Sequence, residues 1–311
     1  MPAISITTPK PFDFDLTASH QTHYRGIAGA DVYEGGVYYR ALRRGSRVLV
    51  AAVSESSGGR GLDVSLEDGA SDSDLAYAAQ AVAGLLGLDA DLSGFYDTLT
   101  ADPVLARTVA SLHGLRPTRT ENVFEALVVA VIGQQISGAV ARVIRDLLVR
   151  TFGTPAEAHG HALFAFPTPH VLAEAGYDEL RAMKLSNRKA EYIHGIAIKT
   201  LDGTINDGHL AGLEDEEAVE ELVKCRGIGR WTAEWMLIRA LGRPDVMPAG
   251  DLALKRVVSQ LYFDGADITE SQLADFGRER WSPYRGLATT YLFSHLRRER
   301  AQNETGPDAA V

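Results

Sequence analysis

The sequence is poor in cysteine and has no long apolar run. Cys225 is the single cysteine among 311 residues, so the chain forms no internal disulfide and cannot by itself hold an iron–sulfur cluster with four cysteine ligands. No stretch of eighteen apolar residues is present, so we expect no membrane-spanning helix. Residues 1–10 lack the charged and then apolar pattern of a secretory signal. These absences favour a cytoplasmic protein.

Basic residues are also scarce relative to acidic ones. The chain has 31 Lys and Arg against 41 Asp and Glu, a net charge of −10, which is the wrong sign for a simple nucleic-acid binder. The distribution is uneven, because residues 224–300 carry 13 basic against 9 acidic residues, whereas residues 121–223 carry 8 against 16. Carboxylates concentrate in residues 214–221, where a helix N-terminus would explain them without a ligand. Three arginines gather at the glycine turn described below: Arg226, Arg230 and Arg239.

The patterning of the chain changes near residue 100. Residues 36–43 and 46–53 read as strands between glycine and serine turns, and residues 71–82 begin with helix-capping residues and continue with helix formers. Helical spacing dominates after residue 104. We therefore predict an α+β fold with a mixed α/β domain over 1–104, a mostly helical region over 105–300 and a flexible polar tail over 301–311. Helices are expected at 121–152, 169–175, 177–183, 188–201, 217–225, 230–241, 251–262, 270–278 and 284–299.

One short motif carries most of the functional information. Gly227-Ile228-Gly229 lies between two segments of helical spacing, which is typical of a tight turn between helices. Backbone N–H groups left free at such a turn can hold a phosphate. The residues predicted to bind a DNA phosphate are the turn and the helix start after it: Gly227, Ile228, Gly229, Arg230 and Thr232.

Asp251 follows this turn after a proline-bearing loop, Met247-Pro-Ala-Gly-Asp251. A carboxylate near a sugar would stabilise the positive charge that develops when an N-glycosidic bond breaks. Its position also fits an N-cap for the helix beginning at Leu252, and the two roles are compatible. Asp251 is the candidate catalytic residue.

Residues 222–256 resemble the helix–hairpin–helix, Gly/Pro-rich loop and catalytic Asp of base-excision DNA glycosylases, and are most similar to the bacterial 3-methyladenine DNA glycosylase II family. Residues 124–137, 185–192 and 281–288 resemble three further motifs of that family, in the family's order. The resemblance covers roughly 105–300, and this branch also carries a mixed N-terminal region. It implies two helical subdomains, with the helix–hairpin–helix at about 217–241.

The resemblance implies a monofunctional enzyme that flips alkylated purines, such as 3-methyladenine and other N3- or N7-alkylpurines, out of double-stranded DNA. Strand-cutting relatives form a Schiff base through a lysine two residues after the second hairpin glycine, and Trp231 occupies that position here. Water attack on the sugar, leaving an abasic site, is then expected. A cationic alkylpurine needs little acid catalysis to leave, so one ionised Asp can suffice.

Aromatic walls would suit an electron-poor base. Trp231 and Trp235 are i and i+4 on one predicted helix and share a face. By similarity Trp235 and Phe293 line the lesion pocket, and Trp231 is a weaker candidate, since aromatics at this spacing also build cores. Gln134 is expected to face the pocket and Gln135 to wedge into the duplex. The alternative is that both amides bridge neighbouring backbone.

Three positions depart from the family pattern and leave the lesion range open. Gly250 stands where an acidic residue is common, Arg226 where proline is usual, and Phe293 where the best-known member has tryptophan. No cofactor is expected to be required. By similarity a sodium or potassium ion could bind the main-chain carbonyls of the hairpin, those of Val223, Cys225 and Ile228, with Cys225 itself a packing residue.

His159 and His161 form a His-x-His pair with no further ligand set, and a solvent loop is the better interpretation. We expect a monomer that binds double-stranded DNA without strong sequence specificity. Two alternatives remain open: a glycosylase of the same scaffold for another lesion, such as deaminated bases, and a helix–hairpin–helix module that only grips DNA.

Overall fold

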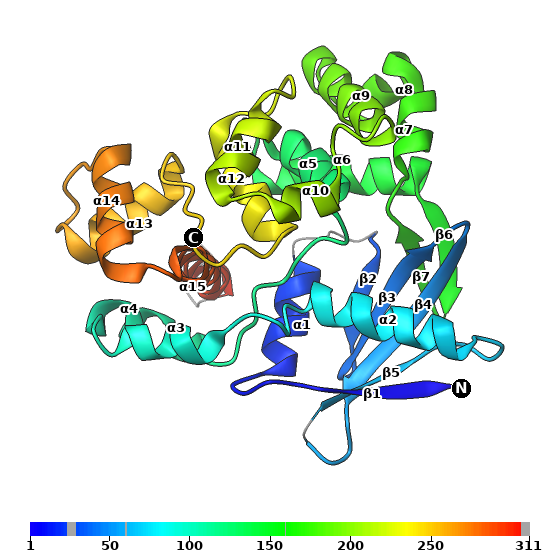
Figure 1. Cartoon of the computed structure of the whole chain (residues 1–311), viewed down its shortest axis with the longest axis horizontal. Coiled ribbons are helices and arrows are strands. Elements are labelled where there is room, and N and C mark those ends of the chain that lie inside the picture. Colours follow the sequence, from blue (N-terminus) through cyan, green and yellow to red (C-terminus); the bar gives the residue numbers. More distant parts are fainter. Residues whose placement is uncertain (24–28, 60, 159, 306–311) are drawn as a thin grey trace.

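The computed structural model describes residues 1–23, 29–59, 61–158 and 160–305. Figure 1 shows three parts: a sheet with two helices, a central helical group from α5 to α12, and a second helical group that contains α3, α4 and α13–α15. The α+β prediction is confirmed. No helix in the described ranges is both long and apolar enough to cross a membrane.

The N-terminal part is an antiparallel sheet of order β1-β5-β4-β3-β2. Its strands are β1 (Ala3–Thr7), β2 (Asp31–Glu34), β3 (Val37–Arg44), β4 (Arg47–Glu55) and β5 (Gly61–Ser65), so both predicted strands are confirmed. One face packs on α1 (Phe14–His23) and α2 (Asp72–Leu85) through residues such as Phe14, Leu62 and Val82. Ser71 and Asp74 form a capping box at the predicted start of α2.

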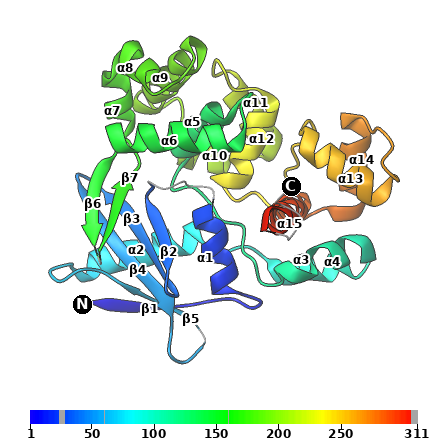
Figure 2. The ribbon, with the colours of Figure 1, turned by 180° about the vertical axis from the view of Figure 1, so that it is seen from behind.

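A second hairpin, β6 (Thr154–Ala158) and β7 (His161–Ala165), corrects the prediction that strands end near residue 104. It reaches from the central helices onto the sheet, as Figure 2 shows from behind. Leu163 and Ala165 pack on Ala41 and Val50, so the hairpin covers apolar surface of the sheet. Its strands are short and contain Pro155, and their burial depends on the distant sheet.

The central group is built around α5 (Val123–Gly133) and α9 (Asn187–Leu201). The predicted continuous helix 121–152 is wrong: it is interrupted at Gln134–Ser137, and Ser137 caps the second helix. The remaining helices are α6 (Gly138–Phe152), α7 (Pro169–Glu174), α8 (Gly176–Ala182), α10 (Asp207–Gly212), α11 (Asp215–Val223) and α12 (Arg230–Arg239). All but α10 fall within predicted helical segments, with shifts of a few residues at their ends.

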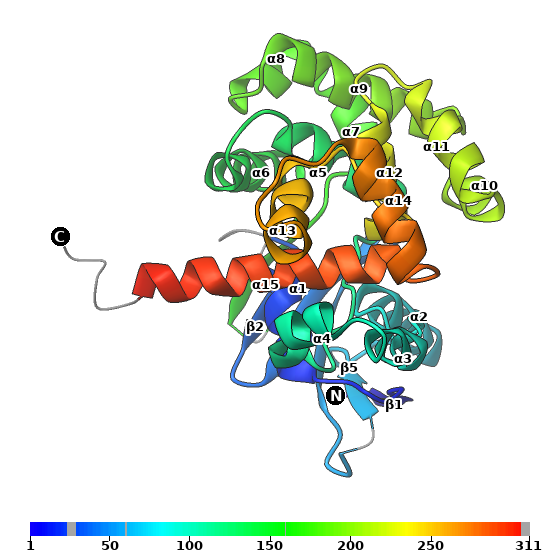
Figure 3. The ribbon, with the colours of Figure 1, turned by 90° about the vertical axis from the view of Figure 1, so that its left-hand side faces the viewer.

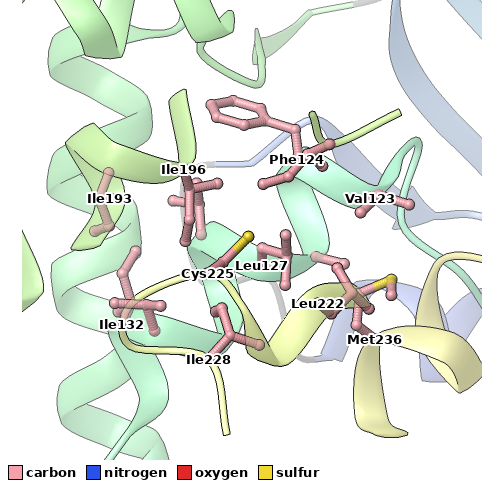
Figure 4. Packing of buried hydrophobic residues seen from close by; sticks show 14 of the residues in the cluster. Val123, Phe124, Leu127, Ile132, Ile193, Ile196, Leu222, Cys225, Ile228 and Met236 are labelled. Carbon is pink, nitrogen blue, oxygen red and sulfur yellow. The ribbon is translucent and has the colours of Figure 1, made fainter. Parts of the chain in front are cut away.

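The core of the central group joins these helices to the glycine turn. Figure 4 shows Cys225 and Ile228 of the turn beside Leu127 and Ile132 of α5 and Ile196 of α9. Each is buried. Burial of the turn's apolar side chains therefore fixes the turn on the helical framework.

The second helical group contains segments far apart in sequence. It comprises α3 (Leu92–Leu99), α4 (Pro103–Val109), the 3₁₀ turn η1 (Ala110–Leu112), α13 (Leu252–Tyr262), α14 (Glu270–Trp281) and α15 (Arg285–Thr305). Figure 3 shows α15 passing between α13 and α4. The ring of Phe95 on α3 packs at a tilt against that of Tyr291 on α15, with centroids 5.0 Å apart. The core of this group therefore crosses the predicted boundary at residue 104.

The C-terminal end differs from the expected flexible tail. Helix α15 continues to Thr305, beyond the predicted end at 299 and into the predicted tail. Residues 306–311 of that tail lie outside the described residues.

Two buried arginines tie the N-terminal part to the helices. Arg40 on β3 forms ion pairs with Asp31, Glu121 and Glu125, the last at the start of α5. Arg116 donates to five main-chain carbonyls: those of Pro9, Pro11, Gly87, Leu88 and Ala90. Buried guanidinium groups need such partners, and those of Arg40 come from both sides of the junction.

Candidate active site

Asp251 lies at the N-terminus of α13, where the loop after α12 enters the second helical group. Its Oδ1 accepts hydrogen bonds from the backbone N–H groups of Ala253 at 2.8 Å and Leu254 at 3.0 Å, so the predicted N-cap is confirmed. The side chain is half-buried. The cap fixes one carboxylate oxygen and leaves the other, Oδ2, directed toward α12.

Two indoles meet that second oxygen. Trp231 Nε1 donates to Asp251 Oδ2 at 2.8 Å, and Trp235 Nε1 donates to the same oxygen at 3.3 Å. Their spacing puts both on one face of α12, as predicted. The Asp251 carboxylate therefore accepts four N–H hydrogen bonds, two on each oxygen. Sequence reasoning assigned both tryptophans to the pocket wall and missed these hydrogen bonds.

Aromatic surface extends from Asp251 to α15. The rings of Trp235 and Phe293 form an edge-to-face pair with centroids 5.1 Å apart, and the Arg239 guanidinium lies 5.3 Å from the centroid of the Trp235 ring. Trp231 is 37% exposed, and Leu252, directly after Asp251, is 77% exposed. The structure thus places Trp231 and Trp235 against the carboxylate and Phe293 against Trp235. The sequence alone did not single out the neighbouring apolar side chain of Leu252.

The glycine turn joins α11 to α12, and its geometry explains Gly227. This residue has φ +92°, and a Cβ placed there would lie 2.3 Å from the ring of Tyr192 on α9. Both the left-handed backbone and the close ring require glycine. Gly229, by contrast, has φ −93°, and a Cβ there would meet nothing within 4 Å.

The predicted phosphate-binding residues are only partly exposed. The Ile228 N–H donates to Cys225 O at 3.0 Å, so the expectation of a free N–H there is wrong, and the Ile228 and Thr232 side chains are buried. The first-turn N–H groups of Arg230, Trp231 and Thr232 have no carbonyl four residues earlier within α12 to accept them. Backbone N–H groups at the start of α12 therefore stay available for a phosphate, whereas that of Ile228 is engaged.

Arg230 is engaged by carboxylates. Its guanidinium donates to both carboxylate oxygens of Glu216 at 2.6 Å and to Glu234 Oε1 at 3.0 Å. The hydrogen bonds to Glu216 raise the pKa of Arg230, and burial raises the pKa of Glu234 to about 7 although Arg230 opposes that shift. Glu216 belongs to the acidic segment that caps α11, where Glu214 and Glu217 form a capping box, as the helix-terminus interpretation predicts.

The other two arginines of the turn are also engaged. Arg226 pairs with Glu191 at 3.3 Å and lies over the Tyr192 ring, whereas Arg239 faces Trp235. The three arginines that sequence proximity groups together thus have different surroundings. The structure does not present them as one basic patch.

Two surface cavities flank the hairpin, with volumes of about 590 and 540 Å³. The first is lined by Tyr177, Glu191, Cys225 and Arg226, and the second by Glu216, Arg230, Glu234 and Glu270. Neither is lined by Asp251. The chemistry of the carboxylate and its indole partners, rather than cavity size, identifies the candidate site.

Gln134 and Gln135 lie in the loop between α5 and α6. Gln134 Nε2 donates to Gly227 O at 3.0 Å and to Thr232 Oγ1 at 3.4 Å, so this amide bridges to the hairpin, in line with the alternative interpretation. Gln135 is exposed and has φ +57°. The two neighbours therefore differ: one holds the loop to the hairpin, and the other projects from it.

The expected cation ligands are carbonyls at the turn. Cys225 O already accepts the Ile228 N–H, which leaves one of its two lone-pair positions. The Cys225 side chain packs in the central core, as expected of a packing residue. Its burial there raises the pKa of the thiol. Within the described ranges, no group of three or more His, Cys, Asp or Glu side chains could hold a metal ion.

His161 corrects the solvent-loop prediction for the His-x-His pair. It begins β7, its ring stacks on Tyr39 with centroids 4.6 Å apart, and its Nε2 lies 3.5 Å from Glu34 Oε2. The histidine helps to attach the second hairpin to the sheet. His159 lies outside the described residues.

Two family models match the chain. The AlkA N-terminal domain matches residues 4–121, and the HhH-GPD superfamily base excision DNA repair protein matches residues 128–283, half of the 311 residues. The chain belongs to the HhH-GPD superfamily. Within this HhH-GPD region lie the glycine turn, both tryptophans and Asp251.

Individual relatives of this HhH-GPD protein are named as DNA glycosylases or DNA repair enzymes. DNA-3-methyladenine glycosylase of Bacillus subtilis is 32% identical over 209 residues, which cover 67% of this chain and 69% of that protein. A Mycobacterium tuberculosis relative, named as a bifunctional transcriptional activator/DNA repair enzyme, is 29% identical, and the match covers 99% of this chain but 60% of its own length. The solved 3-methyladenine DNA-glycosylase from Archaeoglobus fulgidus superposes with a TM-score of 0.82 at 30% identity and covers 96% of this chain and 99% of that one.

Proposed function

We propose that this HhH-GPD protein is a monofunctional DNA glycosylase of base excision repair that releases alkylated purines from double-stranded DNA. The observation that carries the proposal is Asp251, held at the N-terminus of α13 with its Oδ2 facing two indole N–H groups and an aromatic surface. The relatives named as 3-methyladenine glycosylases support the substrate class.

The proposed reaction begins with a flipped nucleotide whose sugar lies against Asp251. As the N-glycosidic bond breaks, electrons leave with the base and positive charge develops on the sugar, where the carboxylate stabilises it. Water then adds to the sugar carbon and loses a proton, which leaves an abasic site and the free base. The N-cap and indole hydrogen bonds hold the carboxylate in place, so little reorganisation is needed during the reaction.

An alkylated purine suits the surroundings of this carboxylate. Alkylation at N3 or N7 makes the base cationic, so the base leaves without strong acid catalysis, and the cation favours aromatic faces. Trp235, Phe293 and the exposed Trp231 supply such faces. The monofunctional assignment rests on Trp231, which stands where an attacking lysine would be needed.

In the proposed complex, the start of α12 binds a DNA phosphate and Gln135 enters the duplex where the flipped base leaves a gap. Gln135 is the exposed residue of the loop, whereas Gln134 is occupied by the hairpin carbonyl. A sodium or potassium ion on the carbonyls of Val223, Cys225 and Ile228 would bridge the turn to the phosphate. These contacts carry no sequence information, so binding without strong sequence preference follows.

The experiment that tests this function measures free-base release from duplexes with one defined lesion each. The panel contains 3-methyladenine, 7-methylguanine, hypoxanthine and an undamaged control. Release of the methylated purines supports the proposal. Release of hypoxanthine alone would show a glycosylase that acts on deaminated bases. DNA binding without release of any base would show a non-catalytic DNA-binding module.

A further inference from the structure

The end of α5 is held by a lysine from another helix. The last carbonyls of a helix lack partners within it, and α5 ends at Gly133, just before the loop that carries Gln135. Lys189 Nζ donates to Ile132 O at 2.9 Å and to Gln134 O at 2.6 Å. One ammonium group therefore binds carbonyls on both sides of the point where the helix stops.

Lys189 is itself fixed by its own helix. It lies in the first turn of α9, where its backbone N–H donates to the Ser186 hydroxyl at 3.3 Å. Burial lowers the pKa of Lys189, and the negative end of the α5 dipole favours its ammonium form. Lys189 is half-buried, and its ammonium group is directed at main-chain carbonyls at the end of α5.

A second residue of α9 supports the hairpin. The Tyr192 ring lies where a side chain at Gly227 would be, and Gly227 O accepts the Gln134 amide. Lys189 and Tyr192 are three residues apart, so they share a face of α9. Helix α9 thus contacts both the loop that carries Gln135 and the glycine turn. The Gln134 amide connects that loop to the turn.

Gln135 needs such support because of its backbone. Its φ of +57° is a conformation that residues other than glycine rarely adopt. The loop has Gln135 at its exposed point, with anchors to α9 and the hairpin on Gln134 directly before it. A strained, exposed residue beside two anchors is a geometry that holds a side chain in a defined place.

We propose that Lys189 is a positioning residue that sets the Gln135 loop relative to the hairpin, so that Gln135 enters the duplex at the gap left by the flipped base. This inference rests on the proposed function, in which a base is flipped. Lys189 does not touch the reacting sugar in this arrangement. Its loss should impair the flipping of a paired base more than the cleavage of a base that is already unpaired.

The test compares Lys189→Met with the wild-type protein on two duplexes, one with 7-methylguanine paired to cytosine and one with it in a single-base bulge. Single-turnover base release is measured on both. We expect the variant to be about 10- to 100-fold slower on the paired lesion, as for a displaced positioning group, and much closer to wild type on the bulge, since an unpaired base costs less to extrude. The ratio of the two rates is independent of how much variant is folded.

Lys199→Met is the matched control, because it removes the same charge from the same helix. It should keep the wild-type ratio. The proposal for Lys189 is overturned if Lys189→Met keeps the wild-type ratio, or if Lys199→Met shows the same selective loss. Absence of release from both duplexes by the wild-type protein would instead contradict the proposed function.

Discussion

The indole nitrogen of Trp231 lies 2.8 Å from Oδ2 of Asp251, and the two residues are joined by a hydrogen bond across the gap between α12 and α13. The bond connects the hairpin, which is proposed to bind the DNA backbone, to the carboxylate that is proposed to act on the sugar. A movement of the hairpin would therefore be transmitted directly to Asp251.

Asp251→Asn should abolish most base release while DNA binding and folding persist. Asparagine is an equally good N-cap, so α13 keeps its cap, but the charge that stabilises the sugar cation is lost, and the amide nitrogen cannot accept the two indole N–H groups. We expect a decrease of about 100- to 1000-fold in single-turnover release, typical for a lost electrostatic group. Binding to a duplex with a stable abasic analogue serves as the control. Release at the wild-type rate would refute the proposed role of this residue.

Trp231→Phe removes one N–H donor and keeps an aromatic ring. We expect base release to fall about 10-fold, because a hydrogen bond to a charged group is lost. Trp235→Phe should have a smaller effect, since its bond to the same oxygen is longer. The double variant should deviate from additivity because both donors share one acceptor. Strictly additive effects on ln(rate) would argue that the indoles act only as pocket walls.

Sodium borohydride should not trap the wild-type protein on lesion-containing or abasic DNA. Trapping requires an amine that attacks the sugar, and Trp231 occupies the position where the resemblance places one. Gel analysis for a covalent adduct checks this. Trp231→Lys is an informative companion, since its amine would stand beside Asp251. A wild-type adduct would contradict the monofunctional mechanism.

Gly227→Ala should lower the free energy of unfolding by about 1–3 kcal/mol, the usual cost of a left-handed non-glycine residue, and more if the Tyr192 ring cannot move. Gly229→Ala, two residues later in the same turn, is the matched control, with ordinary φ and open space, and should stay within about 0.5 kcal/mol of wild type. Urea unfolding measures both. Equal effects of the two substitutions would mean that the turn geometry described here is not what selects glycine.

Glu234 should make stability depend on pH. Burial raises its pKa from 4.5 to about 7 in the folded protein. Between these values the folded protein holds a proton that the unfolded chain has released, so the free energy of unfolding falls as pH rises from about 4.5 to about 7. Glu234→Gln does not titrate, so its stability should fall less over that range, by on the order of 1 kcal/mol, because solvent reduces the effect of a charge near the surface. Unfolding in urea at pH 5 and pH 8 tests this. Identical pH dependence in both proteins would contradict the assignment.

Sequence reasoning was strongest where local chemistry decides the structure. Asp251 reads as an N-cap because it precedes a segment of helical spacing, and the i, i+4 spacing of Trp231 and Trp235 places both rings on one face. The strands over 37–44 and 47–55 follow from β-branched and aromatic residues that lie between glycine and serine turns. In each case neighbouring residues contain the signal.

Non-local partners account for what the sequence did not predict. At the break after α5, the carbonyls of Ile132 and Gln134 are bound by Lys189, which lies on the distant helix α9. From the sequence, Arg230 is a candidate to bind a phosphate. In the folded protein its guanidinium instead donates to Glu216 on α11. Likewise β6 and β7 are stabilised by a sheet more than a hundred residues earlier in the chain, which local propensity cannot show.

The packing of α3 and α4 against α15 has a consequence for how the enzyme can be divided. A fragment that starts at residue 105 would retain the hairpin, both tryptophans and Asp251, yet it would leave Trp281 and Tyr291 without the partners supplied by Asp102 and Phe95. The residues that build the candidate site would be present on a scaffold with part of its core removed. Helices α3 and α4 thus belong to the core of the catalytic half, and we expect the smallest active unit to begin before α3.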